Sequence, residues 1–234
     1  MLRHLLLAAG IACGATAASA VPFEVFGTDA VYGPGLAGNG SSTAPQSFSF
    51  TAGAGQTLIF SDVTGATGCC GGTVGNTGPD GGSGTTNISA LNGISGIVAP
   101  RLLFLAGVFV DSSNPPADPA PGGYNYDTSA NPFISDATFA GIGLNRVFFI
   151  GDGLTGTGSG TVQVFEIPEF ADTLLLGFVD GWSFSGTPSY YGDNPGSVTG
   201  AFTINTPAVP LPAGLPLLAG AIGLGAWVAR RRKN

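Results

Sequence analysis

Basic side chains are nearly absent from the middle of this 234-residue chain. The only His is His4 and the only Lys is Lys233, so both lie close to an end. A Ser or Cys nucleophile paired with His, a His-ligated zinc and a catalytic Lys are therefore excluded from the body of the chain, because each lacks its base or its ligand. Between the ends, Arg101 and Arg146 are the only two basic residues against all 14 acidic residues, a net charge of −12. We expect no nucleic-acid partner, since binding to phosphate needs a basic surface.

Charged residues are also scarce, at 9% of the chain, whereas hydrophobic residues reach 44% and glycine contributes 40 residues. The hydrophobic share is enough for a core, and no strict Gly-X-Y period points to collagen. Helical periodicity is lacking, but apolar or alternating runs of strand length recur between Gly, Pro, Asn and Asp. The strongest runs are 46–51, 57–63, 102–110, 146–150, 161–167, 173–179 and 197–204.

These runs predict an all-β body, an antiparallel β-sandwich over residues 21–205. The apolar run 102–110 predicts a central strand. In the run 161–167, Thr and Gln alternate with Val, which predicts a strand with one solvent-exposed face. The Gly-rich segment 65–96 and the Pro-rich segment 112–131 predict long loops, and such loops in compact domains are often functional.

The N-terminal residues 1–20 have the organisation of a secretory signal peptide. Arg3 and His4 precede an apolar run, and Ala18-Ser19-Ala20 precedes Val21. We expect cleavage after Ala20 and export of the protein. Cys13 leaves a lipoprotein alternative open, although the Leu expected three positions earlier is missing.

The C-terminal residues combine a short Pro-containing motif, an uncharged apolar stretch and a basic end. The 19 residues 211–229 would span about 28 Å as a helix, close to the roughly 30 Å of a bilayer core. We therefore expect a linker and start of the motif over residues 206–210 and a single transmembrane tail over residues 211–234. The basic end should stay cytoplasmic. The motif residues are Val209, Pro210, Leu211, Pro212 and Ala213, and the basic residues are Arg230, Arg231, Arg232 and Lys233.

This tail resembles the PEP-CTERM class of sorting signals, in the Val-Pro-Leu-Pro-Ala (VPLPA-CTERM) variant, over residues 209–234. A plain C-terminal anchor is the simpler alternative. The resemblance implies a Gram-negative bacterium and an exosortase-type membrane protease as partner. The protease would remove the tail after transient anchoring in the inner membrane, and the protein would then reach the cell surface or the extracellular space.

Three further motifs are candidates for chemistry. Cys69 and Cys70 are the only cysteines of the predicted mature chain, and in an oxidising envelope they would form a vicinal disulfide or cross-link to another chain. Two neighbouring thiols do not make a four-ligand zinc site. The segment 151–156 matches G-x-G-x-x-G, but a strand-like run follows where a dinucleotide site needs a helix, so the segment predicts a loop. Asp80 lies in a Gly-rich turn that resembles one copy of a calcium-binding repeat, and such repeats need tandem copies.

Three oxygen-bearing side chains adjoin the last two predicted strands. Asp180 follows the run 173–179, and Asp193 and Asn194 precede the run 197–204. Calcium takes six to eight oxygen ligands, so these residues would supply about half a coordination shell. The alternative is that Asp and Asn are simply good turn-forming residues.

The stretch 174–198 resembles the PA-I type of calcium-dependent galactose-binding bacterial lectin, a jelly-roll-like sandwich. The resemblance spans about residues 45–205 and implies that Asp180, Asp193, Asn194 and the main chain of Tyr190 ligate calcium. Sugar hydroxyls would complete the shell, and a second carbonyl would come from around residues 67–68. The loop between the two aspartates is longer than in those lectins, and their sugar-contacting His has no counterpart here. Calcium binding therefore carries over better than galactose specificity.

The first functional hypothesis is a non-enzymatic, lectin-like surface or matrix protein whose calcium-dependent sandwich binds extracellular polysaccharide. Asp80, Trp182 and Tyr191 are the candidate sugar contacts, because carboxylates accept from hydroxyls and aromatic faces suit sugar rings. The alternatives are that Asp80 is a metal ligand and that the aromatic side chains pack in the core or in loops. The second hypothesis is a structural component of a biofilm matrix with no discrete ligand. The third, an enzyme, is a glycoside hydrolase that pairs Glu166 or Glu169 with Asp180.

Overall fold

The computed structural model describes residues 19–71, 77–127 and 133–207 of the chain. The expected signal peptide, apart from its last two residues, lies outside this part. The sorting motif 209–213, the apolar stretch 211–229 and the basic residues 230–233 also lie outside it. Within the described residues, no helix is long and apolar enough to cross a membrane.

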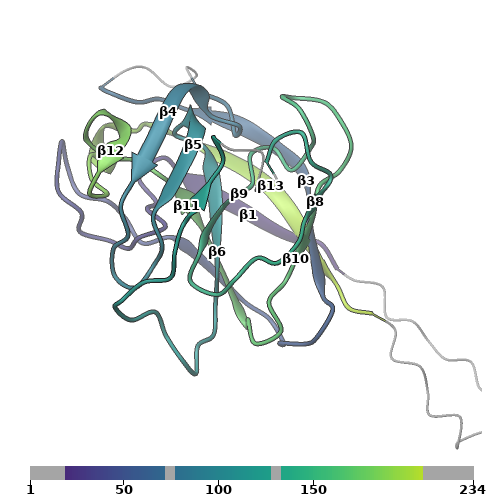
Figure 1. Cartoon of the computed structure of the whole chain (residues 1–234). Helices are drawn as coiled ribbons and strands as arrows, with labels where there is room; N and C mark the ends of the chain where they lie inside the picture. The colour runs from purple at the N-terminus through teal and green to yellow at the C-terminus, as the bar shows by residue number, and fades with distance from the viewer. Residues whose placement is uncertain (1–18, 72–76, 128–132, 208–234) are drawn as a thin grey trace, which may run out of the picture. The chain divides into compact units, whose positions relative to one another are not determined.

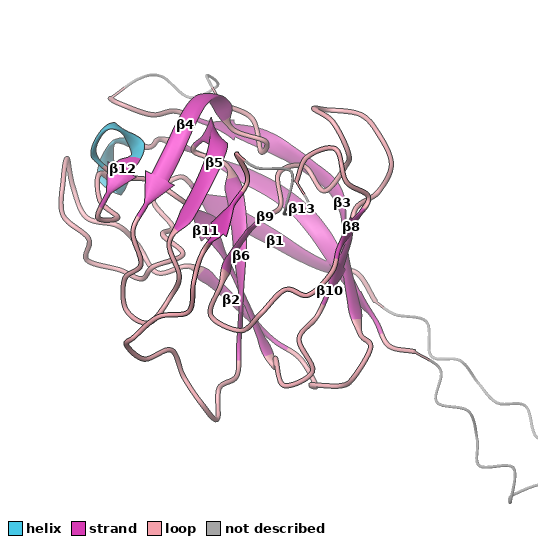
Figure 2. Cartoon of the chain, viewed as in Figure 1, coloured by secondary structure: helices cyan, strands magenta, loops and turns pink. Residues whose placement is uncertain are grey.

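The described residues form three β-sheets (Figure 1). The first sheet has the order β1 (Val21–Phe26), β13 (Gly196–Asn205), β3 (Thr57–Thr67), β10 (Val164–Glu166) and β8 (Thr138–Phe139). The second has the order β2 (Gln46–Ser49), β11 (Thr173–Phe178), β6 (Leu105–Val110) and β9 (Val147–Phe149). The third has the order β12 (Ser185–Gly186), β4 (Gly82–Ile88), β5 (Ile97–Leu102) and β7 (Tyr124–Asn125). Figure 2 shows the helical turn η1 (Trp182–Phe184) beside β12, and a second turn, η2, covers Tyr191–Asp193.

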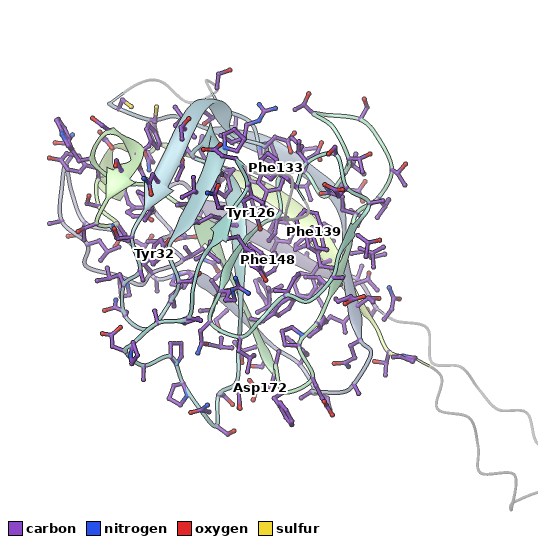
Figure 3. All side chains as sticks on the ribbon, in the orientation of Figure 1. Tyr32, Tyr126, Phe133, Phe139, Phe148 and Asp172 are labelled. Atoms are coloured by element: carbon purple, nitrogen blue, oxygen red, sulfur yellow. The ribbon has the colours of Figure 1, made fainter. Side chains whose placement is uncertain are left out.

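The first and second sheets pack through aromatic side chains. Phe48 of β2 meets Phe202 of β13 with ring centroids 5.2 Å apart, and Phe148 of β9 lies 5.6 Å from Phe165 of β10. Phe148 and Phe139 are seen inside the fold in Figure 3. Burying one such ring stabilises the fold by about 1.5–3 kcal/mol. The predicted all-β, β-sandwich-like fold is confirmed at this level.

The apolar run 102–110 is divided between two sheets. Leu102 ends β5 in the third sheet, and β6 starts at Leu105 in the second. Between them, Leu103 adopts a left-handed conformation with φ of 48°, which turns the chain out of one sheet and into the next. β6 itself is buried at every residue and lies between β11 and β9, as expected for a central strand.

The alternation expected over residues 161–167 is wrong. β10 covers only Val164–Glu166, and Val162 is exposed while Gln163 is fully buried. The Gln163 amide donates to the carbonyls of Phe133 and Asp136, at 3.3 and 2.9 Å. The side chain is buried because it satisfies main-chain acceptors of a neighbouring loop, a role that periodicity does not reveal.

The segment 65–96 is not one long loop, which corrects a second expectation. It contains the end of β3 and all of β4, which pairs with β5. β4 reads Gly-Ser-Gly-Thr-Thr-Asn-Ile, and its glycines weaken the strand signal. The segment 151–156 is a loop between β9 and β10, as predicted, with Gly151 and Gly153 at positive φ.

Candidate functional site

Asp180 lies two residues after the end of β11 and is 3% exposed. The hydroxyl of Tyr191 fixes the chain here, because it accepts from the Asp180 main-chain N–H at 3.0 Å and donates to the carbonyl of Phe178 at 3.3 Å. A buried carboxylate therefore lies just beyond the end of β11. The hydroxyl of Tyr191, from the next loop, holds the main chain at this point.

The Asp180 carboxylate accepts two hydrogen bonds. The Gly181 N–H donates to Oδ1 and the Asn194 side-chain amide donates to Oδ2, both at 2.7 Å. Burial raises the pKa of Asp180 from 3.8 to about 7; these hydrogen bonds oppose the rise and the charge of Asp193 adds to it. This acid is costly to ionise where it lies, because no positive charge of the described residues compensates its burial.

Asn194 is 1% exposed and connects two parts of the chain. Its Nδ2 donates to Asp180 and, more weakly, to the carbonyl of Gly27 at 3.4 Å. A Cβ at Gly27 would overlap the main-chain carbonyl of Asn194, so glycine is required for this approach. The Oδ1 of Asn194 is buried and has no hydrogen-bond partner among the described residues. Leaving such an acceptor unsatisfied costs about 1–3 kcal/mol.

Asp193 is held by the loop of residues 37–40, which the sequence did not single out. Asn39 Nδ2 donates to Asp193 Oδ2 at 3.0 Å, and the Tyr190 N–H donates to the Ala37 carbonyl at 2.9 Å. A Cβ at Gly40 would lie 3.0 Å from the Gly192 α-carbon, so the two loops approach too closely for larger residues. The Gly-Asn-Gly sequence at residues 38–40 was the available signal for such a contact.

These residues surround a pocket of about 340 Å³, called the Asp180 pocket below. The indole of Trp182 lies at this pocket, 65% exposed, with its ring centroid 4.8 Å from that of Tyr190. Arg101 and Arg146, the basic residues of the described part, are not among its lining residues. The pocket is lined by Asn39, Cys70, Asp180, Gly181, Trp182, Ser183, Phe184, Tyr190 and Asp193.

The structure thus brings together most of the residues singled out from the sequence, but two sugar contacts are corrected. Tyr191 is 0% exposed, so its ring cannot meet a sugar. Asp80 lines a different cavity, of about 530 Å³, together with Asp62 and Asp152. There Asp80 Oδ1 accepts from the Asp152 N–H at 3.0 Å, and burial raises the Asp80 pKa to about 6.

A main-chain carbonyl ligand was expected around residues 67–68, and of these two residues only Gly68 is left as a candidate. The Thr67 carbonyl already accepts from the main-chain N–H and the hydroxyl of Thr77, at 3.1 and 3.0 Å. A carbonyl oxygen has two lone pairs, so Thr67 has no remaining position for an ion.

The two glutamates of the hydrolase hypothesis lie elsewhere. Glu166 and Glu169 line a cavity of about 370 Å³ with Gln56, and Asp180 is not among the residues around it. Glu166 Oε2 accepts from the Gly141 N–H at 3.2 Å. The structure therefore does not form the pairing of either glutamate with Asp180.

Cys69 and Cys70 are free thiols, with Cys70 Sγ donating to Cys69 Sγ at 2.9 Å. Burial raises the pKa of the Cys69 thiol to about 12, and the charges of Cys70, Asp180 and Asp193 contribute. The disulfide between these two cysteines stays a prediction. The thiols lie close enough to Asp180 and Asp193 for the charges of these carboxylates to raise the pKa of Cys69.

No three His, Cys, Asp or Glu side chains of the described residues are grouped so that they could hold a metal ion. A cation at the Asp180 pocket would therefore depend on two carboxylates with amide and main-chain oxygens, the neutral donors that calcium accepts. The buried, unpartnered Oδ1 of Asn194 fits that donor set. Comparisons of the chain with protein-family models, with curated proteins and with solved structures find no match.

Proposed function

We propose that the protein is a calcium-dependent carbohydrate-binding surface protein, with calcium and sugar meeting at the Asp180 pocket. One observation carries the proposal: the buried carboxylate of Asp180 lies against Asn194, whose own Oδ1 is buried and has no hydrogen-bond partner in the described part of the chain. A buried negative charge and an unsatisfied acceptor both disfavour the metal-free protein, and one cation relieves both.

Calcium would be held by Asp180, Asp193 and Asn194, with main-chain oxygens such as that of Tyr190 as further ligands. When bound, the ion would offer open coordination positions to vicinal sugar hydroxyls. The chain's own part is to keep the carboxylates oriented. Gly181 and Asn194 do this for Asp180, and Asn39 does it for Asp193.

The sugar would lie against Trp182. Its large exposed face is supported from the side by Tyr190, and both residues line the same pocket as the two aspartates. Flat aromatic faces bury apolar surface of sugar rings, while a metal and carboxylates select hydroxyl geometry. This juxtaposition favours a carbohydrate ligand over a matrix role without any ligand.

The proposals on the type of sandwich, on export and on processing of the tail are based on the sequence. We propose a jelly-roll-like sandwich, in which the first and last strands, β1 and β13, are neighbours. We also propose export by the signal peptide and removal of the tail by an exosortase-type protease, from the motif at residues 209–213. The exported protein would then meet extracellular polysaccharide.

Calcium titration of the purified full-length protein by calorimetry tests the metal site, and a glycan array probed with calcium and with chelator tests the sugar site. Saturable calcium binding in the wild type, lost in Asp180→Asn and kept in Asp127→Asn, supports the proposal. Asp127 is an exposed aspartate outside the pocket and serves as the matched control. Equal binding by both variants would disprove the assignment.

A further inference from the structure

The wall of the Asp180 pocket contains one of two adjacent thiols. Cys70 is exposed and lines the pocket, whereas Cys69 is half-buried and packs against the core. Their sulfur atoms lie 2.9 Å apart. The third cysteine of the sequence is Cys13, in the predicted signal peptide, so after cleavage each of these thiols has only the other as an intramolecular partner.

The thiol segment is tied to the ligand loop through the backbone. β3 and β13 pair up to Thr67 and Gly196, and one further bond runs from the Gly68 N–H to the Pro195 carbonyl at 2.8 Å. Pro195 directly follows Asn194, and Gly68 directly precedes Cys69. A backbone change at Cys69 therefore has to pass through only one hydrogen bond to reach Pro195, the residue next to the proposed calcium ligand Asn194.

We propose that Cys69 and Cys70 are a modification site, a dithiol that small-molecule disulfides oxidise reversibly to a vicinal disulfide, and that this oxidation changes cation binding in the Asp180 pocket. The effect on the cation rests on the proposed function of that pocket. The modification itself rests on the two thiols alone.

The oxidation is thiol–disulfide exchange in two steps. The thiolate of exposed Cys70 attacks one sulfur of the small-molecule disulfide, forms a mixed disulfide and releases one thiolate. The deprotonated sulfur of Cys69 then attacks the Cys70 sulfur and releases the second thiolate. The two cysteines lose two electrons and two protons, and the small-molecule disulfide gains them to become two thiols.

Formation of the disulfide between Cys69 and Cys70 closes a small ring and changes the wall of the Asp180 pocket. A disulfide needs its sulfurs about 2.05 Å apart, so the side chain of Cys70 has to move towards Cys69 from its place at the pocket. The ring also removes rotational freedom from both side chains next to Gly68. A wall that is ordered before binding lowers the entropy cost of binding, so the oxidised protein should bind calcium more tightly, on the order of 3- to 10-fold.

The test uses the full-length protein carrying Cys13→Ser, so that Cys69 and Cys70 are its only thiols, equilibrated in reduced or oxidised glutathione. Free thiols are counted by alkylation and calcium affinity is measured by calorimetry. We expect loss of both free thiols in the oxidised sample, a monomer on a non-reducing gel, and the tighter calcium binding given above. Cys70→Ser, a change at an exposed side chain, should show the same calcium affinity in both buffers. Equal affinities for oxidised and reduced wild type, persistence of both thiols, or a cross-linked dimer would each overturn the proposal.

Failure of the calcium site can be separated from failure of the modification. If neither form binds calcium, the emission of Trp182 reports on the pocket, measured in a Trp227→Phe background because the chain has two tryptophans. A spectral shift on oxidation that Cys70→Ser lacks supports redox control of the pocket without calcium. An unchanged spectrum contradicts it.

Discussion

The side-chain amide of Asn194 donates to the Asp180 carboxylate at 2.7 Å, and the Oδ1 of the same amide has no partner within the described residues. A buried acid and an unsatisfied buried acceptor therefore lie side by side. In a protein without need of a cation, hydrophobic residues of similar volume would be more stable here. The arrangement is explained if an ion binds there, and the first predictions concern that ion.

Asp180→Asn should lose the rise in melting temperature that calcium gives the wild type. A ligand that binds only the native state stabilises it by RT ln(1 + [L]/Kd), about 4 kcal/mol at 1,000 times Kd. The substitution keeps the size of the side chain but removes the charge. Melting curves with calcium and with chelator measure the effect, and a full calcium-induced shift in the variant would show that Asp180 is not a ligand.

Asp193→Ala and Asp180→Ala should not be additive in calcium-dependent stability. In the proposed site both carboxylates bind one ion, so either variant should lose most of the shift, and the double variant should lose little more. A double-mutant cycle of melting temperatures measures the coupling. Additive losses would mean that the two aspartates act in separate places.

Calcium affinity should rise with pH. Burial raises the pKa of Asp180 from 3.8 to about 7, so between these values the native protein holds a proton that the unfolded chain has released. The group's contribution to metal-free stability is therefore complete below about pH 4 and is lost as the pH rises through about 7. Calcium competes with this proton, so its apparent affinity should increase by up to about tenfold per pH unit below pH 7 and then level off.

Calorimetric titrations between about pH 5 and pH 8.5 check this dependence. Asp80→Asn is the control, because burial raises the Asp80 pKa to about 6 in a different cavity. That variant should change the pH dependence of stability between about pH 4 and pH 6 and leave the calcium profile as it is. A flat calcium profile in the wild type would contradict the role of Asp180.

The sequence predicted the all-β fold and the meeting of Asp180 with Asn194, because both signals are local. Each residue lies beside a strand with a strong apolar pattern, β11 for Asp180 and β13 for Asn194, and these two strands belong to different sheets. It could not predict that Asn39 binds Asp193, because 154 positions separate the two residues. Only the close approach of two glycine-containing loops brings them together.

The sequence also did not predict which polar and aromatic side chains are buried. The sequence left sugar contact and core or loop packing open for both Tyr191 and Trp182, and the structure buries the first ring and exposes the second. The backbone between them is irregular, because Ser183, Phe184 and Tyr190 all take left-handed conformations, with φ of 51°, 55° and 67°. No periodicity encodes such a turn in a loop.

Tyr191→Phe should destabilise the fold without acting on the sugar. The hydroxyl links the Asp180 N–H to the Phe178 carbonyl. Its removal leaves the Asp180 N–H unpaired in the interior, while the Phe178 carbonyl still accepts from the Val31 N–H at 3.3 Å. The expected loss is about 1–3 kcal/mol in the free energy of unfolding. Denaturant unfolding measures it. Unchanged stability, or loss of glycan binding with calcium binding intact, would reinstate Tyr191 as a sugar contact.

Trp182→Ala should abolish glycan binding while calcium binding remains. The indole is 65% exposed, so its removal costs the fold little, but it takes away the aromatic face that the pocket offers. Loss of one stacking residue weakens binding by about 1–2 kcal/mol beyond the lost area, enough to bring a weak lectin below detection. Phe170→Ala is the matched control, because that ring is 66% exposed and does not line the pocket. Glycan arrays and calcium calorimetry on both variants separate the two sites, and a Trp182→Ala protein that keeps its glycan binding would place the sugar elsewhere.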